Sequence, residues 1–246
     1  MRLKKSHLAA VGLVTLIVGL MIFFPARVAY QWFAPPVLSL TGIEGSLWSG
    51  SAREGAASGI YARDLKWRLR PLSIFTGELS YAFEASPEGG FVEGNVGLAS
   101  DGSIALTDLN AALSLHDFQG TIALPGLTGN VSAKFTRLLL DNGIPVAADG
   151  VIEVANLLVP TISRSSIGGY RAEFFTQDSG IMASVEDTDG VVDLAGSLQL
   201  SSDQTYQFLA QIAPKENTPD RVRQQMQFLG SANERGQHSF RLEGQL

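Results

Sequence analysis

Apolar and polar residues alternate along much of this chain. Within residues 78–84, Leu79, Tyr81 and Phe83 point to one side of an extended backbone, and the residues between them point to the other. The same alternation recurs in three further segments, 61–69, 192–200 and 204–212. A period of two is typical of an antiparallel strand with one buried face and one solvated face. The pattern therefore predicts a mainly β protein built around one antiparallel, curved sheet.

Turn signals separate the predicted strands at intervals of about ten residues. They are Pro87-Glu-Gly-Gly90, Ser100-Asp-Gly-Ser103, Asp141-Asn-Gly143, Asp149-Gly150 and Thr188-Asp-Gly190. Asn-Gly and Asp-Gly pairs favour positive φ angles and so suit tight hairpins. This spacing predicts neighbouring strands that follow one another directly along the chain.

Helix is predicted in only two places beyond the N-terminus. Residues 71–77 fit a single turn between strands. Residues 218–230 fit a short helix, with Thr218 as the N-cap, Pro219 at the first helical position and Gly230 just past the end. Its apolar stripe, formed by Val222, Met226 and Leu229, is expected to cover an open edge or end of the sheet.

The N-terminal region is a candidate membrane anchor. Residues 8–24 carry no charge, and the aromatic residues Tyr30 and Trp32 follow, which extends the segment to residue 32. About 20 apolar residues are needed to cross a bilayer. Basic residues precede the segment at positions 2, 4 and 5, so the positive-inside rule predicts a cytoplasmic N-terminus and an exported remainder. The alternative is a cleaved signal peptide, although no small-residue cleavage site follows.

These features predict four parts. Residues 1–7 are a cytoplasmic N-terminus, 8–32 a transmembrane anchor, 33–36 a proline-containing spacer and 37–246 a periplasmic β-rich domain. The chain is expected to cross a membrane once; the family resemblance described below implies that this is the bacterial inner membrane, with the β-rich domain in the periplasm.

Charge and composition exclude several functions. All 24 acidic residues lie beyond the anchor, whereas 15 of the 18 lysines and arginines follow the three basic residues at the N-terminus. An acidic domain is a poor nucleic-acid binder, because phosphate contacts need a basic surface. The chain has no cysteine, which excludes disulfides and thiolate chemistry.

The residues do not assemble into a recognisable catalytic or cofactor site. His116 and His238 lie in strand-like contexts, and the spacing around Ser46 and Ser49 does not match a nucleophile elbow. The acidic run 186–190 lacks the closing glutamate of a calcium loop and fits a hairpin turn instead. We expect no enzyme activity, no metal and no cofactor.

Two tryptophans and a basic strand are the candidate interaction residues. Trp48 lies among glycines that allow another strand to approach closely, so it is either a core residue under a bend or part of a binding surface. Trp67 alternates with Lys66, Arg68 and Arg70. In the strand 61–69 the alternation also places Tyr61 on the side of Leu65, Trp67 and Leu69. The basic face is either simply solvated or a docking surface for an acidic partner near the membrane.

The order of short motifs resembles one known family. Gly45-Ser-Leu-Trp-Ser-Gly50 followed by Ser51-Ala52 is similar to the Gly-Thr-Val-Trp-Ser-Gly-x-Ala signature of the type II secretion system protein N family, with Ser46 and Leu47 as departures. Leu65-Lys-Trp-Arg-Leu-Arg-Pro-Leu72 resembles the Trp-Arg-Leu-x-Pro that follows in that family. Pro25-Ala26 and the C-terminal Phe240-Arg-Leu-Glu-Gly244 also fit.

The resemblance implies a non-enzymatic inner-membrane subunit that helps move folded proteins from the periplasm across the outer membrane. It implies partners among the other secretion subunits, namely the protein C component and the secretin, which this subunit would scaffold. A single anchor followed by many short strands also resembles AsmA-like groove proteins, which bind or carry lipid in the envelope. A periplasmic hydrolase is a third hypothesis, which would need a polar pocket that joins a histidine to a serine or carboxylate.

Overall fold

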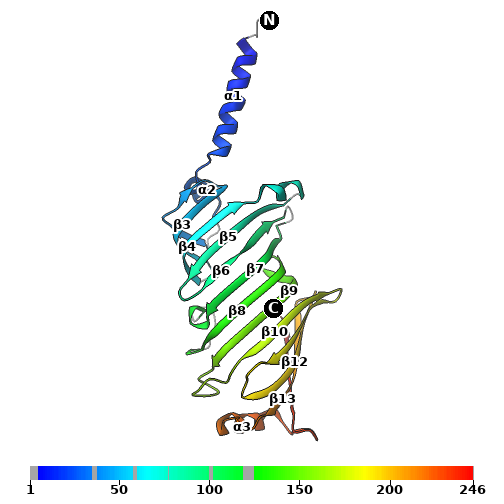
Figure 1. Cartoon of the computed structure of the whole chain (residues 1–246). Helices are drawn as coiled ribbons and strands as arrows, with labels where there is room; N and C mark the ends of the chain where they lie inside the picture. The colour runs from blue at the N-terminus through cyan, green and yellow to red at the C-terminus, as the bar shows by residue number, and fades with distance from the viewer. Residues whose placement is uncertain are drawn as a thin grey trace.

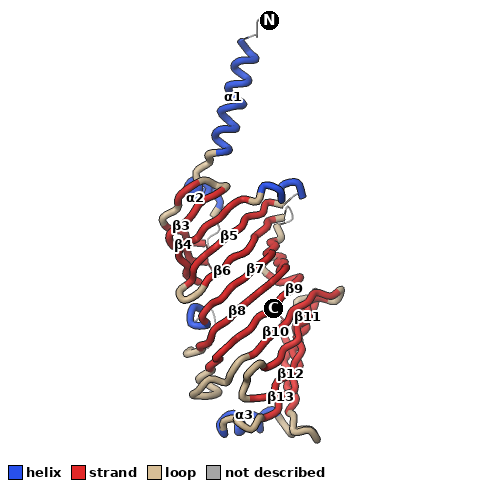
Figure 2. Tube along the Cα trace, in the orientation of Figure 1, coloured by secondary structure: helices blue, strands red, loops and turns tan. Residues whose placement is uncertain are grey.

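The computed structural model of the chain is one long, twisted β-sheet with a helix extending from one end (Figure 1). It describes residues 5–34, 38–57, 60–76, 78–99, 102–118 and 125–245. Within these residues the three α-helices lie at the two ends of the sheet, as Figure 2 shows, and the middle is a single layer of strands. The predicted mainly β, antiparallel architecture is confirmed.

The elements of the described residues have the following bounds. The helices are α1 (Lys5–Ile22), α2 (Ala26–Phe33) and α3 (Asp220–Met226), and the 3-10 turns are η1 (Pro71–Thr76), η2 (Leu115–Phe118) and η3 (Gln227–Leu229). The strands are β1 (Leu38–Thr41), β2 (Glu44–Gly45), β3 (Ser49–Ala57), β4 (Ile60–Leu69), β5 (Leu79–Pro87), β6 (Phe91–Leu98), β7 (Ile104–Ser114), β8 (Thr128–Asp141), β9 (Ile144–Leu158), β10 (Tyr170–Gln177), β11 (Gly180–Asp187), β12 (Val192–Ser201), β13 (Thr205–Pro214) and β14 (His238–Gln245).

The strands pair in nearly the order in which they occur in the sequence. From β3 to β14 each strand pairs antiparallel with the next, while β1 and β2 both pair with β3. The predicted Asn-Gly turn joins β8 to β9, and Asn142 and Gly143 have the positive φ angles, 50° and 84°, that such a hairpin needs. Residues 100 and 101 of the turn predicted between β6 and β7 lie outside the described residues.

The segment predicted as one anchor from residue 8 to residue 32 is divided into two helices. Helix α1 ends at Ile22, and Pro25 follows with an extended backbone (φ −66°, ψ 133°). Proline disfavours the helical conformation of the residue before it, which accounts for the break. The second helix, α2, packs on the sheet through its buried Ala26 and Ala29. None of the helices in the described part of the chain is long and apolar enough to cross a membrane. Residues 35 and 36 of the predicted spacer are not among those described.

The sheet has one apolar face and one polar face, which we call the inner face and the outer face. A continuous inner row crosses the strands from β4 to β14 through Trp67, Phe83, Gly94, Leu109, Phe135, Gly150, Phe174, Ala183, Leu198, Phe208 and Leu242. The neighbouring outer row begins with Lys66, Glu84, Glu93, Asn110 and Lys134. The predicted two-faced sheet is therefore present along these rows.

The sheet curves towards its inner face. Some residues of β9 and β11 have Cα atoms within 8 Å of each other, although β10 lies between the two strands. In a flat sheet they would be about 9.6 Å apart, because neighbouring strands are about 4.8 Å apart. The curvature makes the inner face a shallow trough.

Bulges at three Asx-Leu pairs increase the twist of the sheet. Asp64, Asp108 and Asn156 have left-handed backbones, with φ angles of 52°, 51° and 53°. Asp64 and Asp108 lie where the register shifts between paired strands, and Asn156 lies beside a third such shift. A bulge inserts one unpaired residue and bends the strand. Each of these residues is followed by a leucine that faces the trough, at positions 65, 109 and 157.

Substitution of Asp64 tests the role of the bulge. We expect Asp64→Ala to lower the free energy of unfolding by about 1 kcal/mol, because a Cβ-bearing residue without a short polar side chain is strained at positive φ. Asp64→Gly is the matched control and should change stability by less than about 0.5 kcal/mol, because glycine adopts this backbone freely. Urea unfolding of the full chain in mild detergent measures both. Equal losses in the two variants would contradict the proposed backbone strain.

The bulge also explains a wrong prediction. The sequence placed Tyr61 on the face of Leu65, but the extra residue at Asp64 reverses the side on which the preceding residues point. Tyr61 is instead 40% exposed on the outer face, where the guanidinium carbon of Arg63 lies 5.9 Å from the centre of its ring. The predicted turn at Asp149-Gly150 is also wrong, because both residues lie within the long strand β9.

The sequence predicted a helix that covers an open edge or end of the sheet, and α3 lies at the far end (Figure 1), where it packs on the inner face. Val222 and Met226 are buried against Val192 of β12. Thr218 does not cap the helix, because the N-cap is Pro219 and no side chain caps it. The Thr218 hydroxyl instead donates to the carbonyl oxygen of Val191 at 2.5 Å and accepts from the backbone N–H of Lys215 at 2.7 Å. Thr218 therefore ties the segment before α3 to the sheet.

An ion pair fixes the same segment and should make stability depend on pH. Asp187 of β11 pairs with Lys215, and its other oxygen accepts the backbone N–H of Leu194 at 2.8 Å. Burial opposes ionisation of Asp187, but the hydrogen bonds from Lys215 and Leu194 outweigh it and hold its pKa below the usual 3.8. A lowered pKa contributes stability above the unfolded value, and this stability is lost as pH falls through the folded value.

Asp187→Asn should therefore lower the free energy of unfolding by about 1–3 kcal/mol at neutral pH. The difference from the unsubstituted protein should stay constant above about pH 5 and shrink below about pH 4, where the native carboxylate also becomes protonated. Urea unfolding at a series of pH values measures this. A difference that does not change down to the lowest pH would contradict the ionic contribution.

Candidate interaction surfaces

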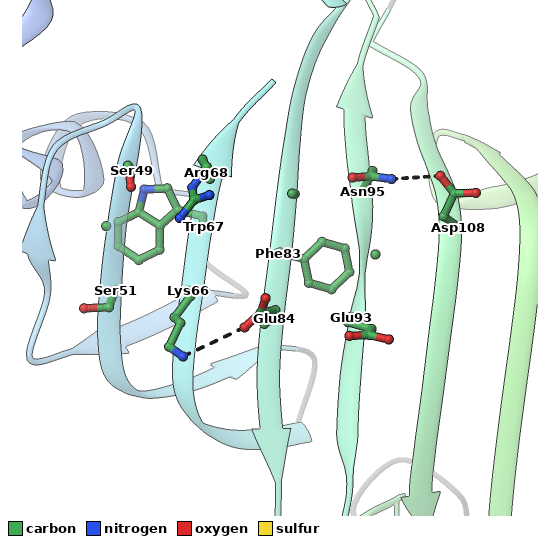
Figure 3. A pocket seen from close by; sticks show the side chains of 13 residues that line it. Ser49, Ser51, Lys66, Trp67, Arg68, Phe83, Glu84, Glu93, Asn95 and Asp108 are labelled. Carbon is green, nitrogen blue, oxygen red and sulfur yellow. Dashed lines mark hydrogen bonds and ion pairs between the residues drawn. The ribbon is translucent and has the colours of Figure 1, made fainter. Parts of the chain in front are cut away.

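The basic residues of β4 line an open cleft on the outer face of the sheet (Figure 3). The cleft has a volume of about 580 Å³ and includes Lys66 and Arg68. It also includes three carboxylates, those of Glu84, Glu93 and Asp108. Arg70 follows β4 and is exposed beyond the cleft. The surface is therefore mixed in charge, whereas the sequence predicted a basic face.

Short-range pairs satisfy much of the polar chemistry of this cleft. Lys66 Nζ lies 3.9 Å from Glu84 Oε2, and both side chains are 66% exposed. Asn95 Nδ2 donates to Asp108 Oδ2 at 3.1 Å. An exposed ion pair of this kind contributes about 0–1 kcal/mol. The cleft is therefore closer to an ordinary solvated surface than to a binding site with charges held ready for a ligand.

The indole rings of the two candidate tryptophans do not share the exposed outer position of the cleft cations, although Trp67 also contributes to the lining of the cleft. Trp67 points to the inner face, where its indole N–H donates to the carbonyl oxygen of Ser46 at 3.3 Å and its ring packs beside Ala26 and Ile43. Trp48 is half-buried in the turn between β2 and β3, and its carbonyl oxygen accepts the N–H of Leu69 at 2.6 Å. The predicted interaction residues therefore divide between the two faces of the sheet.

Aromatic rings on the inner face lie across glycines of neighbouring strands. A Cβ atom added to Gly150 would lie 2.5 Å from the ring of Phe135, and one added to Gly50 would lie 2.4 Å from the ring of Trp67. Phe208 covers Gly196 and Tyr206 covers Gly244 in the same way. Glycine at these points allows the rings to lie along the sheet. The trough therefore keeps a smooth, low apolar surface.

In the described part of the chain, helices cover the inner face at its two ends. Helix α2 packs near Trp67 at the first strands, and α3 packs on β12 at the last. Between them lies a third cluster centred on Phe135, Ala148 and Ile181. Most apolar side chains of the trough are half-buried, and within the described residues no large side chain is fully buried. A single-layered sheet thus leaves an apolar surface without a second layer.

An apolar cavity of about 430 Å³ lies where α3 meets the sheet. Its walls include Leu157, Ile162, Ile167, Leu194, Ile212 and Leu229. Tyr170 also lines it and donates to the carbonyl oxygen of Ile167 at 3.2 Å. Burial, with the negative charges of Asp187 and Asp189 adding to it, raises the pKa of Tyr170 to about 12. The cavity wall is therefore neutral at physiological pH.

The residues considered for catalysis have structural partners. Ser46 and Ser49 are hydrogen-bonded to each other across a turn, with Ser46 Oγ 3.3 Å from the carbonyl oxygen of Ser49. His116 lies in the turn η2 and not in a strand as predicted. His238 begins β14, and its Nδ1 is 2.8 Å from the carbonyl oxygen of Gly230. None of these contacts joins a histidine to a serine.

Comparison with known proteins assigns the chain to a family. The family described as type II secretion system (T2SS), protein N, matches residues 36–241. The chain belongs to the type II secretion system protein N family. Its signature residues around Gly45–Gly50 and Trp67 form the α2-covered end of the inner face.

Three curated members of this family are similar over nearly the whole chain. The type II secretion system protein N of Vibrio cholerae serotype O1 (strain ATCC 39315 / El Tor Inaba N16961) is 26% identical over 94% of both chains. The protein N of Aeromonas hydrophila is 24% identical over 99% of both chains. That of Pectobacterium carotovorum subsp. carotovorum is 23% identical over 100% of both chains. No solved structure matches this chain.

Proposed function

We propose that this member of the type II secretion system protein N family is a non-enzymatic subunit, held at the inner membrane, that scaffolds other subunits through the inner face of its sheet. Family membership supports a role in protein secretion. The observation that carries the scaffolding role is the continuous apolar row from Trp67 to Leu242, most of whose described side chains are only half-buried. An apolar surface of this extent is typical of an interaction site.

The tether in this proposal is the N-terminal segment, with residues 1–7 in the cytoplasm and the β-rich domain in the periplasm. Support comes from the uncharged run 8–24 and from α1, which extends away from the sheet (Figure 1). Its described side chains are exposed, with Leu16 at 59% and Leu20 at 63%. A tether confines the domain to one membrane face and so raises its effective concentration beside other anchored subunits. A C-terminal reporter that is active only outside the cytoplasm tests this orientation.

The expected occupant of the inner face is a segment of another secretion subunit, with the protein C component and the secretin as the first candidates. Strand edges and apolar pockets are common docking sites for peptide segments. The outer cleft at Lys66 and Arg68 is the less favoured surface, because its cations face three carboxylates within the same cleft. The inner face combines a larger extent with an absence of competing charge along the row.

Lipid is the second candidate occupant, and the cavity beneath α3 favours it. An acyl chain needs only apolar, non-directional contacts. The cavity supplies them with a neutral wall next to the inner row. In this version the subunit would shield acyl chains in the envelope, as the AsmA-like alternative predicts.

Photo-crosslinking in intact cells separates these possibilities. A benzophenone amino acid replaces either Phe83, whose ring lies beside Gly94 and Leu109 in the inner row, or Ala82, its neighbour, which lines the outer cleft. We expect Phe83 to yield an adduct with another secretion subunit and Ala82 to yield none. Recovery of lipid from Phe83 would favour the second candidate. Adducts from Ala82 alone, or from neither position, would overturn the assignment of the inner face.

A further inference from the structure

Helix α2 is firmly attached to the sheet. The Tyr30 hydroxyl donates to the carbonyl oxygen of Leu38 at 3.1 Å and accepts the N–H of Leu40 at 3.0 Å. Arg27 Nε donates to the carbonyl oxygen of Ile43 at 2.7 Å. The bonds reach both β1 and the turn that follows it. Tyr30 therefore packs with the β domain, whereas the sequence placed it within the predicted anchor 8–32.

The break before α2 is tied to the sheet as well. The backbone N–H of Leu47 donates to the carbonyl oxygen of Phe24 at 2.8 Å, and Pro25 forms an isolated bridge with Ser46. Together with the buried Ala26 and Ala29, these contacts hold residues 24–30 against the first strands. The junction between α1 and the sheet is therefore a packed structure and not a loose linker.

The opposite side of this junction exposes an aromatic cluster. Phe23, Trp32 and Phe33 are 78%, 68% and 76% exposed. The ring of Trp32 lies 5.9 Å from that of Phe24 and 6.3 Å from that of Phe33. Large aromatic side chains so exposed would be unfavourable in water. The cluster follows directly on the exposed apolar side chains of α1, such as Leu20 and Ile22.

We propose that α2 lies in the membrane–water interface, with the aromatic cluster Phe23, Trp32 and Phe33 among the lipid headgroups. The aromatic cluster contacts the bilayer surface, because it is continuous with the apolar helix α1 that the proposed tether places in the same membrane. Amphipathic helices of this kind bury their apolar face about 5–10 Å into the headgroup boundary, and tryptophan favours that region. The inference rests on the proposed tether.

This arrangement fixes the tilt of the sheet above the membrane. Leu72 in the turn η1 is 78% exposed, and η1 lies at the same end of the sheet as α2 (Figure 1). Contact at both α2 and η1 would hold the first strands beside the bilayer. The start of the inner row, at Trp67, is then held close to the membrane surface, whether its occupant is an anchored subunit or a lipid.

The absence of cysteine in the chain allows a direct test with single-cysteine variants. The full chain is reconstituted in vesicles of phosphatidylethanolamine and phosphatidylglycerol and labelled with an environment-sensitive fluorophore. The labelled variants are Trp32→Cys, Gln31→Cys and Leu72→Cys, all at exposed positions where substitution removes little packing. Leu16→Cys reports on the tether, and Leu209→Cys, on the outer face of β13, is the matched control for water.

We expect lipids with a nitroxide near the headgroup to quench the labels at 32 and 72 at least about two-fold more than the label at 209, which corresponds to a shallow interfacial position. Deep nitroxides should quench the label at 16 most strongly. Quenching at 16 with none at 31, 32 or 72 would overturn the interfacial helix and leave the tether intact. No quenching at any position would overturn both the tether and this inference.

Discussion

Replacement of Phe135 by alanine is expected to lower the free energy of unfolding by about 3–5 kcal/mol. Phe135 is 7% exposed at the centre of the inner face. Its ring covers Gly150 and lies 5.7 Å from the ring of Phe174. Truncation removes this apolar area and leaves a gap beside a glycine, which has no side chain to fill it. Urea unfolding of the full chain in mild detergent, followed by tryptophan fluorescence, measures the loss.

Phe175 supplies the matched control for this substitution. It lies next to Phe174 on β10 but points to the outer face, and it is 39% exposed. Phe175→Ala should cost less than about 1.5 kcal/mol, because less apolar area leaves water when the protein folds. Similar losses for the two variants would mean that the two faces contribute equally to stability, which contradicts a core confined to the inner face.

A charge on the inner face should abolish secretion without unfolding the protein. Leu198 is half-buried in the inner row of β12, and its neighbour Ser197 is exposed on the outer face. If a partner covers the trough, Leu198→Asp places an unpaired carboxylate in that interface, at a cost of about 3 kcal/mol. This corresponds to roughly a hundred-fold loss of affinity. We expect secretion to fall at least about ten-fold.

The measurement is the activity of a secreted enzyme in the medium of a strain that lacks the native gene and carries the variant. Ser197→Asp adds the same charge one residue away and should leave secretion within about two-fold, because the outer face stays in water. Immunoblots of the membrane fraction confirm that both variants accumulate equally. Normal secretion by Leu198→Asp at a normal level of protein would show that the inner face has no role.

The two-faced sheet was predictable from the sequence because alternation acts locally. Leu79, Tyr81 and Phe83 needed no knowledge of their neighbours to be placed on one side. Tyr61 was misplaced because a single unpaired residue at Asp64 reverses the alternation. The Asx-Leu pair alone does not reveal such a bulge, since Asp193-Leu194 has the same form and lies in the regular strand β12.

The long-range features of the candidate surface could not be predicted in this way. The pair Asp149-Gly150 predicts a turn, because Asp-Gly favours one. Only the pairing of β9 with β8 shows that the ring of Phe135 occupies the space where a side chain at Gly150 would lie. The continuous inner row likewise depends on the register of eleven consecutive strands. The division of the N-terminal segment was open to prediction, because Pro25 lies within it.

Thiol labelling of the inner face tests the central proposal most directly. In the cysteine-free chain, Leu198→Cys reports on the inner face and Ser197→Cys on the outer face. A maleimide should label both at similar rates in cells that lack the other secretion subunits. In cells with the complete secretion system, we expect labelling at 198 to slow at least about ten-fold while labelling at 197 is unchanged, because burial in an interface excludes the reagent. Equal labelling at 198 in the two strains would contradict an inner face that serves as the docking surface.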